Sequence, residues 1–354
     1  MTSNLLSVRL LALASAATLL LGGCTGTLGD PGAGSATKVA LLLPESKTAR
    51  YESFDRPYFE AKLATLGDYE VLYSNADQDA AKQQTQAEAA LVSGVEVLVL
   101  DPVDSAASAS IVTAANAQGV PVIAYDRFIE GGTLDYYVSF DNDKIGRLQG
   151  EALIAKLDQE GATGGILMLN GSPTDANDDD FKAGAHSQID GSGYDVLAEF
   201  DTPDWSPDKA QEWVAGQITL YEGEFSAIYA ANDGTAGGAI AALKAANVSP
   251  LPIVTGQDAE IAALQRIIAG DQYATIYKAM KQQAELAAVI ADKLARGEEV
   301  TGDLEIKGTP STLLDGVTVT IDNIMSTVIA DGIYTVDDIC TPAYIAQCVA
   351  AGIE

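Results

Sequence analysis

Short apolar segments alternate with helix-forming segments along most of this chain, and that alternation constrains the fold more than any other feature. Ten segments rich in β-branched and apolar residues begin near Lys38, Glu70, Val95, Val120, Asp135, Gly165, Tyr194, Ser226, Leu251 and Asp271. Stretches rich in Ala, Gln and Leu lie between many of them, at 78–92, 105–118, 145–157, 207–221, 235–246 and 259–269. Apolar strands that alternate with helices form parallel sheets covered on both faces. The sequence therefore predicts an α/β fold with two similar, doubly wound lobes.

The charge balance removes several classes of partner and of chemistry. The 354 residues include 20 Lys and Arg against 50 Asp and Glu, which gives a formal net charge of −30. Nucleic acids and anionic membrane surfaces are bound by clustered cations, so neither is expected as a partner. The sequence has one histidine, His186, which leaves no room for Ser-His-Asp, Cys-His or multi-histidine metal chemistry. We expect no cofactor and no metal.

The N-terminus has the pattern of an export signal. An apolar run over residues 5–21 ends in Leu21-Gly22-Gly23-Cys24, and such a run closed by small residues is typical of a secretory signal. Small residues directly before a cysteine resemble the lipobox of bacterial lipoproteins, which implies a signal peptide over 1–23 and lipidation of Cys24. The alternative is an ordinary signal peptide with a chance cysteine. Residues 24–37 predict a flexible tether, so the folded part is expected outside the cytoplasm, anchored to the cell membrane.

The two remaining cysteines agree with export. Cys340 and Cys348 lie near the end of the chain, eight positions apart. Outside the cytosol two such thiols most often pair, so we expect a disulfide that staples the terminus. A redox or metal-binding pair is the alternative.

Polar residues follow most of the predicted strands. In open α/β sheets ligands bind outside the carboxyl ends of the strands, so two such lobes would face each other across a binding cleft. The strand-end residues are Asp101, Asp126, Arg127, Asp141, Asn142, Ser172, Asp201, Asn232, Asp233, Gln257, Asp258 and Lys278. Asp, Asn and Ser also serve as helix N-caps, and capping is the preferred interpretation for Asp141, Ser172 and Asp233.

The residue types at this cleft favour a neutral polyol as the ligand. Asp126, Asp233 and Asp258 would repel an anion, and the chain has neither G-x-x-x-x-G-K-[ST] nor G-x-G-x-x-G to hold a phosphate. Carboxylates accept hydrogen bonds from hydroxyl groups, and Arg and Lys donate them. An indole such as that of Trp205 packs against the C–H groups of a sugar.

Eight motifs occur together and in order. They are PESKTARY (44–51), VIAYDR (122–127), YYVSFDN (136–142), GSPTDAN (171–177), DWSP (204–207), ANDGTAGGAI (231–240), GQDAE (256–260) and TIYK (275–278). Over about residues 38–333 the chain thereby resembles the sugar-binding proteins of ABC importers, in the D-xylose-binding branch of the periplasmic-binding-protein family. The resemblance implies two Rossmann-like lobes, joined by three crossings, that close over a monosaccharide.

The resemblance also implies roles for individual residues. Arg50 matches an arginine that donates to sugar hydroxyls, Asp126 and Arg127 match an acceptor–donor pair, and Trp205 matches a stacking tryptophan. Tyr51 stands where relatives often have a tryptophan. The complete set of implied ligand-binding residues is Arg50, Tyr51, Asp126, Arg127, Asn177, Trp205, Asn232, Asp258 and Lys278.

Some positions depart from the family pattern or have a simpler interpretation. Ala176 replaces one asparagine of the S-P-x-D-N-N element, and Lys182 replaces a downstream arginine, which puts the fine selectivity for the ligand in doubt. Residues 175–180 weakly resemble a calcium loop, but Asp180 stands where that loop requires glycine. Core packing is the alternative for Tyr125 and Tyr277, turn formation for Gln257, and solvent exposure for Lys47.

The leading hypothesis is a lipid-anchored sugar-binding subunit that delivers a monosaccharide, with D-xylose as the first candidate, to an ABC permease. A sensory protein that presents sugar to a membrane receptor would have the same cleft. A glycosidase would need two carboxyl groups about 5–9.5 Å apart with opposed pKa values, whereas Arg127 and Lys278 would keep both ionised. We therefore expect no enzymatic activity.

The lobe limits follow from the implied crossings. The N-terminal lobe is expected to hold residues 38–141 and 280–308, and the C-terminal lobe residues 142–276 and 313–354. Most subunits of this kind act alone, so a monomer is expected.

Overall fold

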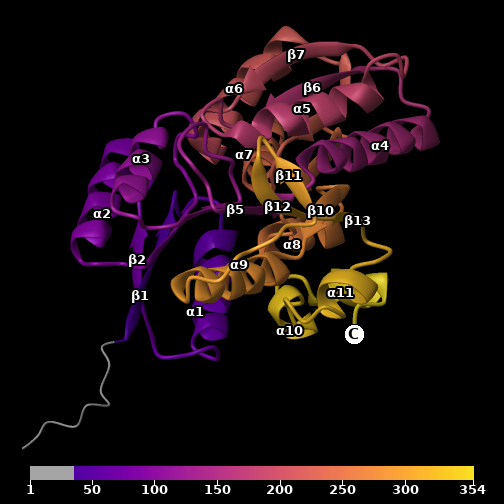
Figure 1. Cartoon of the computed structure of the whole chain (residues 1–354). Helices are drawn as coiled ribbons and strands as arrows, with labels where there is room; N and C mark the ends of the chain where they lie inside the picture. Colours follow the sequence, from indigo (N-terminus) through magenta and orange to yellow (C-terminus); the bar gives the residue numbers. More distant parts are fainter. Residues whose placement is uncertain (1–35) are drawn as a thin grey trace, which may run out of the picture. The chain divides into compact units, whose positions relative to one another are not determined.

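The computed structural model describes residues 36–354, whose strands form two β-sheets (Figure 1). The predicted signal peptide, Cys24 and nearly all of the predicted tether lie outside the described residues. The first strand begins at Thr37, so the tether prediction extends one residue too far. Among the described residues, no helix has the length and apolar character needed to cross a membrane.

The first sheet has seven strands in the order β11-β12-β5-β4-β3-β1-β2. Their bounds are β1 (Thr37–Leu43), β2 (Tyr69–Asn75), β3 (Val97–Leu100), β4 (Val122–Tyr125), β5 (Tyr136–Phe140), β11 (Leu304–Ile306) and β12 (Thr309–Leu314). The helices η1 (Tyr51–Asp55), α1 (Arg56–Leu63) and α9 (Met280–Ala295) pack on one face, and α2 (Ala80–Val92) and α3 (Ala109–Ala117) on the other. We call this sheet with its helices the N-lobe.

The second sheet has six strands in the order β13-β10-β9-β8-β6-β7. Their bounds are β6 (Gly165–Asn170), β7 (Val196–Asp201), β8 (Phe225–Ala230), β9 (Ile253–Gln257), β10 (Ala274–Lys278) and β13 (Gly316–Val319). The helices α4 (Asn142–Glu160) and α5 (Ala176–Ile189) cover one face, and α6 (Pro207–Leu220) and α7 (Asp233–Ala245) the other. The short helix η2 (Pro203–Trp205) precedes α6. We call this sheet with its helices the C-lobe.

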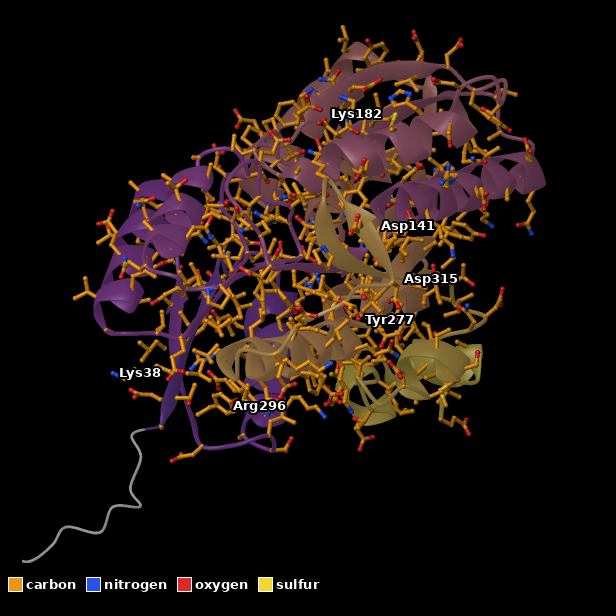
Figure 2. The ribbon with its side chains drawn as sticks, in the orientation of Figure 1. Lys38, Asp141, Lys182, Tyr277, Arg296 and Asp315 are labelled. Atoms are coloured by element: carbon orange, nitrogen blue, oxygen red, sulfur yellow. A yellow bond between two sulfur atoms is a disulfide. The ribbon has the colours of Figure 1, made fainter. Side chains whose placement is uncertain are left out.

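The chain passes between the two sheets after β5, after β10 and after β12. Asp141 and Asp315 lie at two of these crossings (Figure 2), and Asp315 is paired at 2.5 Å with Lys144 at the start of α4. Parallel α/β lobes with three crossings are the predicted architecture. The predicted lobe boundary at residue 313 is wrong, because Leu313 still belongs to β12 of the first sheet.

Three strands were absent from the prediction. β11 has three residues, β12 reads TPSTLL and β13 reads GVTV, so none has the apolar run that identified the other strands. β12 pairs with β5 and β13 pairs with β10, each in a different sheet. These short strands therefore form because an existing sheet edge supplies their hydrogen-bonding partners.

The end of the chain packs against the C-lobe. The helices η3 (Met325–Ile329), α10 (Val336–Ile339) and α11 (Ile345–Ala351) share a hydrophobic cluster with α8 (Ile261–Ala269). Cys340 and Cys348 are joined by a disulfide, with their Cα atoms 5.9 Å apart. The bond links the end of α10 to α11, and both half-cystines lie buried in this cluster.

Candidate functional site

All nine predicted ligand-binding residues line one cavity between the lobes, at the carboxyl ends of the strands. Its volume is 20 Å³, room for about one water molecule. The N-lobe contributes four of the predicted residues and the C-lobe five. Thr48, Asp175, Phe181 and Gln257 also line it and were not in the predicted set.

Arg50 is held from three sides in the N-lobe half of the cavity. Its Nε and Nη2 each donate to the Asp55 carboxylate at 2.8 Å, and its Nη1 donates to Asp126 at 2.8 Å. Gln283 of α9 accepts from Nη2 at 2.6 Å and also donates to Asp126 at 3.1 Å. The arginine side chain is 2% exposed. Asp55 and Gln283 therefore fix the guanidinium before any ligand is considered.

The charge state of Asp126 is decided by its neighbours. Burial alone would raise its pKa, but Arg50, Lys278 and Arg127 outweigh that effect and lower the pKa to about 2. Asp126 is thus a permanent carboxylate at neutral pH, able to accept but not to donate. Tyr51, by contrast, is kept protonated, because burial raises the pKa of its phenol well above the usual value.

The C-lobe half is positioned mainly by helix starts and strand ends. Asn232 is the N-cap of α7, where its Oδ1 accepts from Thr235 N at 2.8 Å. The Nδ2 of Asn232 makes no hydrogen bond within residues 36–354, and the residue lines the cavity. Lys278 ends β10 and pairs with Asp258 at 2.7 Å. These residues present a free amide and a paired cation to the cavity.

Three cavity residues have left-handed backbone conformations. The φ angles are 61° at Asp126, 51° at Trp205 and 96° at Asp258. Such φ values are rare for non-glycine residues, above all for a bulky one such as Trp205, and they gather at functional sites. Gly171 leaves space for the Trp205 ring, since a Cβ at that position would clash with it. The backbone is therefore shaped to direct these side chains into the cavity.

Asp175 is the most important cavity residue that the sequence prediction missed. It is the N-cap of α5, and its carboxylate accepts from Trp205 Nε1 at 3.0 Å. Its Oδ2 also lies 2.8 Å from the Nε of Arg127 in the other lobe. Asp175 belongs to the GSPTDAN motif, but the sequence prediction took only Asn177 of that motif as a ligand-binding residue. Gln257, interpreted as a possible turn residue, also faces the cavity.

The capping predictions were partly wrong. Asp141 is confirmed as the N-cap of α4, where it accepts from Lys144 N. Ser172 caps no helix and instead contacts Thr174. Asp233 follows the cap of α7, and its buried carboxylate accepts from Gln272 at 2.8 Å. The helix α7 starts one residue earlier than the capping prediction requires for Asp233, so Asn232 is the N-cap and Asp233 lies in the first turn.

The two departures from the family pattern lie outside this cavity. Lys182 lies in the C-lobe (Figure 2), where it pairs with Asp201 at 2.9 Å and Glu199 at 3.3 Å, both on the edge strand β7. Ala176 lines a neighbouring groove. Their effect on selectivity is therefore indirect at most.

The lobes touch each other directly around the cavity. Asn177 Nδ2 donates to the backbone oxygen of Asp126 at 3.2 Å, and Ser105 N donates to Thr174 O at 3.0 Å. On another side, Gln78 Nε2 donates to the backbone oxygen of Asp204, at 3.3 Å. A molecule larger than water can enter only if such contacts separate.

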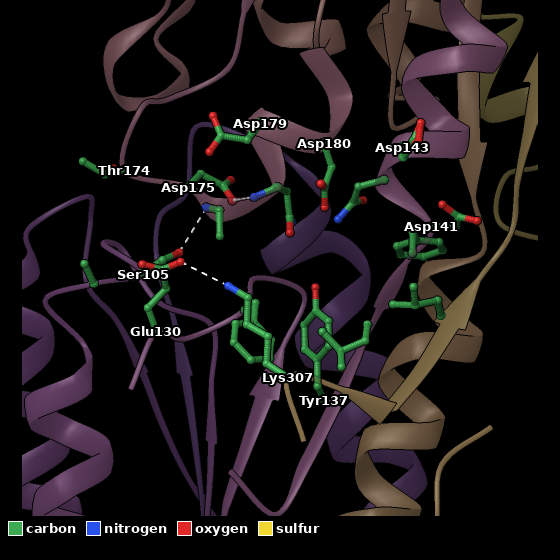
Figure 3. Close-up of a pocket in the computed structure, with 18 of the residues that line it drawn as sticks. Ser105, Glu130, Tyr137, Asp141, Asp143, Thr174, Asp175, Asp179, Asp180 and Lys307 are labelled. Carbon is green, nitrogen blue, oxygen red and sulfur yellow. Dashed lines mark hydrogen bonds and ion pairs between the residues drawn. The ribbon is translucent and has the colours of Figure 1, made fainter. Parts of the chain in front are cut away.

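A larger groove of 530 Å³ adjoins the cavity and shares Asp175 and Asn177 with it (Figure 3). Seven of its twenty described lining residues are Asp or Glu, and Lys307 is the one basic residue among the twenty, paired with Glu130 at 3.2 Å. No cluster of three or more Asp, Glu, His or Cys suited to a metal ion occurs within residues 36–354. The groove therefore disfavours anions at the edge of the cavity.

Comparison with known proteins gives consistent matches over most of the chain. A family model described as a periplasmic binding protein domain matches residues 39–299. The D-xylose-binding periplasmic protein of Haemophilus influenzae is 34% identical over 310 residues, which cover 85% of this chain and 92% of that protein. The protein of the same name from Escherichia coli K12 is 34% identical over 305 residues, covering 84% and 91%.

A solved structure matches the fold as well as the sequence. It is an ABC transporter solute binding protein from Clostridium phytofermentans with bound β-D-glucose, at 30% identity and a TM-score of 0.78. The match covers 86% of this chain and 100% of that one. The chain is thus similar in sequence to proteins named for D-xylose and in structure to a protein that holds D-glucose.

Proposed function

This chain belongs to the family of periplasmic binding proteins, and on that basis we propose that it is the substrate-binding subunit of an ABC sugar importer. It captures a monosaccharide, D-xylose in the first instance, between its lobes and delivers it to the membrane permease. The family consists of sugar-binding transport proteins rather than enzymes.

The observation that carries the proposal is the charge balance of the cavity lining. Three carboxylates stand against three cations: Asp126, Asp175 and Asp258 against Arg50, Arg127 and Lys278. A neutral ligand rich in hydroxyl groups disturbs this balance least, and each hydroxyl can donate to a carboxylate while it accepts from a cation. Tyr51, Phe181 and Trp205 supply aromatic faces for the C–H groups of the ring.

The size of the cavity requires the lobes to move. A pyranose is several times larger than one water, so the sugar must enter while the lobes are apart and then replace some of the contacts between them. Ligand that binds better to the closed arrangement shifts the population toward it. The direct contacts between the lobes, such as the hydrogen bond from Asn177 to Asp126, support a closed arrangement as one end of this movement.

The first test is a thermal-shift and calorimetry screen of about twenty monosaccharides, with D-xylose and D-glucose included. A sugar at 100 times its Kd should raise the unfolding free energy by about 2.7 kcal/mol. The sugar should be recovered chemically unchanged. If no monosaccharide shifts the melting temperature, the assignment of the cavity is wrong.

The anchor is part of the same proposal. We propose that Cys24 takes a diacylglyceryl group and tethers the folded body to the outer face of the membrane. In cells, the Cys24→Ser variant should then move from the detergent fraction to the soluble fraction. A variant that still requires detergent for extraction would refute lipidation at this residue, but would leave the sugar assignment intact.

A further inference from the structure

Asp101 is a buried residue whose carboxylate makes no hydrogen bond that would explain its place in the described residues. It follows β3, its side chain is fully buried, and neither of its carboxylate oxygens accepts a hydrogen bond within residues 36–354. Its backbone oxygen is held by Gln83 Nε2 at 2.8 Å, so the loop is fixed while the carboxylate is not. Buried polar groups almost always have partners. The Asp101 carboxylate is an exception to this rule, and its neighbours suggest a reason.

Arg127 is the cation that faces Asp101. Its Nη1 donates to Pro102 O at 3.1 Å and its Nη2 donates to the Tyr51 hydroxyl at 3.2 Å. Both partners belong to the N-lobe, so the guanidinium stays with this lobe when the lobes separate. Only Nε faces the other lobe, where it lies 2.8 Å from Asp175.

The Nε of Arg127 lies between two carboxylates. Asp101 of the same lobe is 3.5 Å away and Asp175 of the other lobe is 2.8 Å away. The N–H group is aligned with neither of them and makes no hydrogen bond. Asp175 has two other donors, Trp205 Nε1 and Asn177 N, both of its own lobe. Asp175 therefore remains satisfied when the lobes part, whereas Arg127 would lose a partner.

We propose that Arg127 exchanges carboxylates as the lobes move, pairing with Asp101 when they are apart and with Asp175 when they are together. The inference rests on the proposed sugar-driven closure. A side-chain movement of about 1 Å would bring Nε within the distance of a charge-assisted hydrogen bond to Asp101. Asp101 is then a positioning residue that stabilises the open arrangement and weakens sugar affinity without touching the sugar.

The exchange predicts opposite effects for the two carboxylates. Asp101→Asn removes the negative charge that pairs with Arg127 in the open arrangement, so the sugar-free protein should become more compact and bind sugar more tightly. Asp175→Asn removes the negative charge that pairs with Arg127 in the closed arrangement, so the sugar-free protein should open and bind more weakly. Each affinity change should be about fivefold or more, the scale of coupled equilibria in proteins.

Small-angle X-ray scattering of the sugar-free mature protein measures the separation of the lobes, and calorimetry with D-xylose measures affinity. Asp104→Asn is the matched control, because Asp104 lies in the same loop and its carboxylate accepts from Ala106 N and Ala107 N of the same lobe; its lobe separation should equal that of the wild type. If Asp101→Asn does not fold, Asp101→Ser carries the same expectation.

Scattering changes of the same sign for Asp101→Asn and Asp175→Asn, or no change for Asp101→Asn with an intact melt, would overturn the exchange. Because the scattering measurement needs no sugar, it tests the exchange even if D-xylose fails to bind. Failure of binding would count against the proposed function instead.

Discussion

The N-lobe and C-lobe halves of the cavity are built on different principles. In the N-lobe half, Arg50 and Asp126 belong to one buried network that extends to Asp55 and to Gln283 on α9. In the C-lobe half, Asn232 is a local helix cap that also faces the cavity. The comparison teaches that the N-lobe half derives its geometry from one extended network of paired charges, whereas the C-lobe half combines the ends of regular elements with the single Lys278–Asp258 pair.

The difference determines what a substitution removes. A change in the charged network leaves a buried partner unpaired, so stability and binding fall together. A change at a helix cap removes a few local hydrogen bonds, so stability and binding can be separated by a suitable replacement. Three predictions use this contrast, from the largest expected effect to the smallest.

Asp126→Ala should have the largest effect. It leaves Arg50 with an unpaired Nη1 in a buried site, and loss of one partner of a buried ion pair costs about 3–5 kcal/mol. Urea unfolding should show that loss, and calorimetry should detect no sugar binding. Asp126→Asn, which keeps an oxygen acceptor for Arg50, should unfold closer to the wild type. Equal unfolding free energies for Asp126→Ala and the wild type would show that the ion pair between Asp126 and Arg50 does not stabilise the fold.

The two lobes should also differ in the sign of their pH dependence, as Asp126 of the N-lobe and the buried Asp233 of α7 in the C-lobe illustrate. The pKa of Asp126 is lowered to about 2, so its contribution to stability is present above its unfolded pKa of about 3.9 and is lost as the pH falls toward 2. Burial, with a smaller contribution from Asp258, raises the pKa of Asp233 to about 7. Its contribution is present at low pH and is lost as the pH rises through 7.

Urea unfolding at pH 6 and pH 8 measures the Asp233 effect. The wild type should lose about 1.4 kcal/mol over this interval from Asp233 alone, one pKa unit of differential protonation. Asp233→Asn should remove that part of the slope. Asp208→Asn is the matched control, because Asp208 is an exposed acid in the first turn of α6. A slope that Asp233→Asn leaves unchanged would show that Asp233 does not titrate in this range.

Asn232 gives the smallest effect on stability and the sharpest separation of roles. Asn232→Ala removes the cap of α7 and should cost about 1 kcal/mol, whereas Asn232→Ser keeps a capping oxygen and should cost only a few tenths. Both replacements lack the Nδ2 group that faces the cavity, so both should weaken sugar binding. Wild-type affinity for Asn232→Ser would mean that Asn232 serves α7 only.

Much of the candidate site could be predicted from the sequence because its signals are local. Strand ends bring Asp126, Asp258 and Lys278 to the same edge of their sheets, and motif resemblance identified Arg50 and Trp205. The sequence prediction missed one charged residue of the cavity, Asp175. Asp175 stood two positions from a predicted residue, and its role depends on Arg127, 48 positions earlier in the other lobe. No pattern within one segment contains that information.

By itself, the sequence determined the alternation of strands and helices, the two-lobed α/β fold and nine of the residues that line the cavity. Apolar periodicity, caps and strand-end chemistry act over a few residues, and a reader of the sequence can see them. Only the tertiary structure decided that Gln283 would support Arg50, that β12 and β13 would extend different sheets, and that Arg127 would lie between Asp101 and Asp175. Those partners meet because the chain crosses between the lobes three times, and long-range contacts follow from the crossings rather than from local composition.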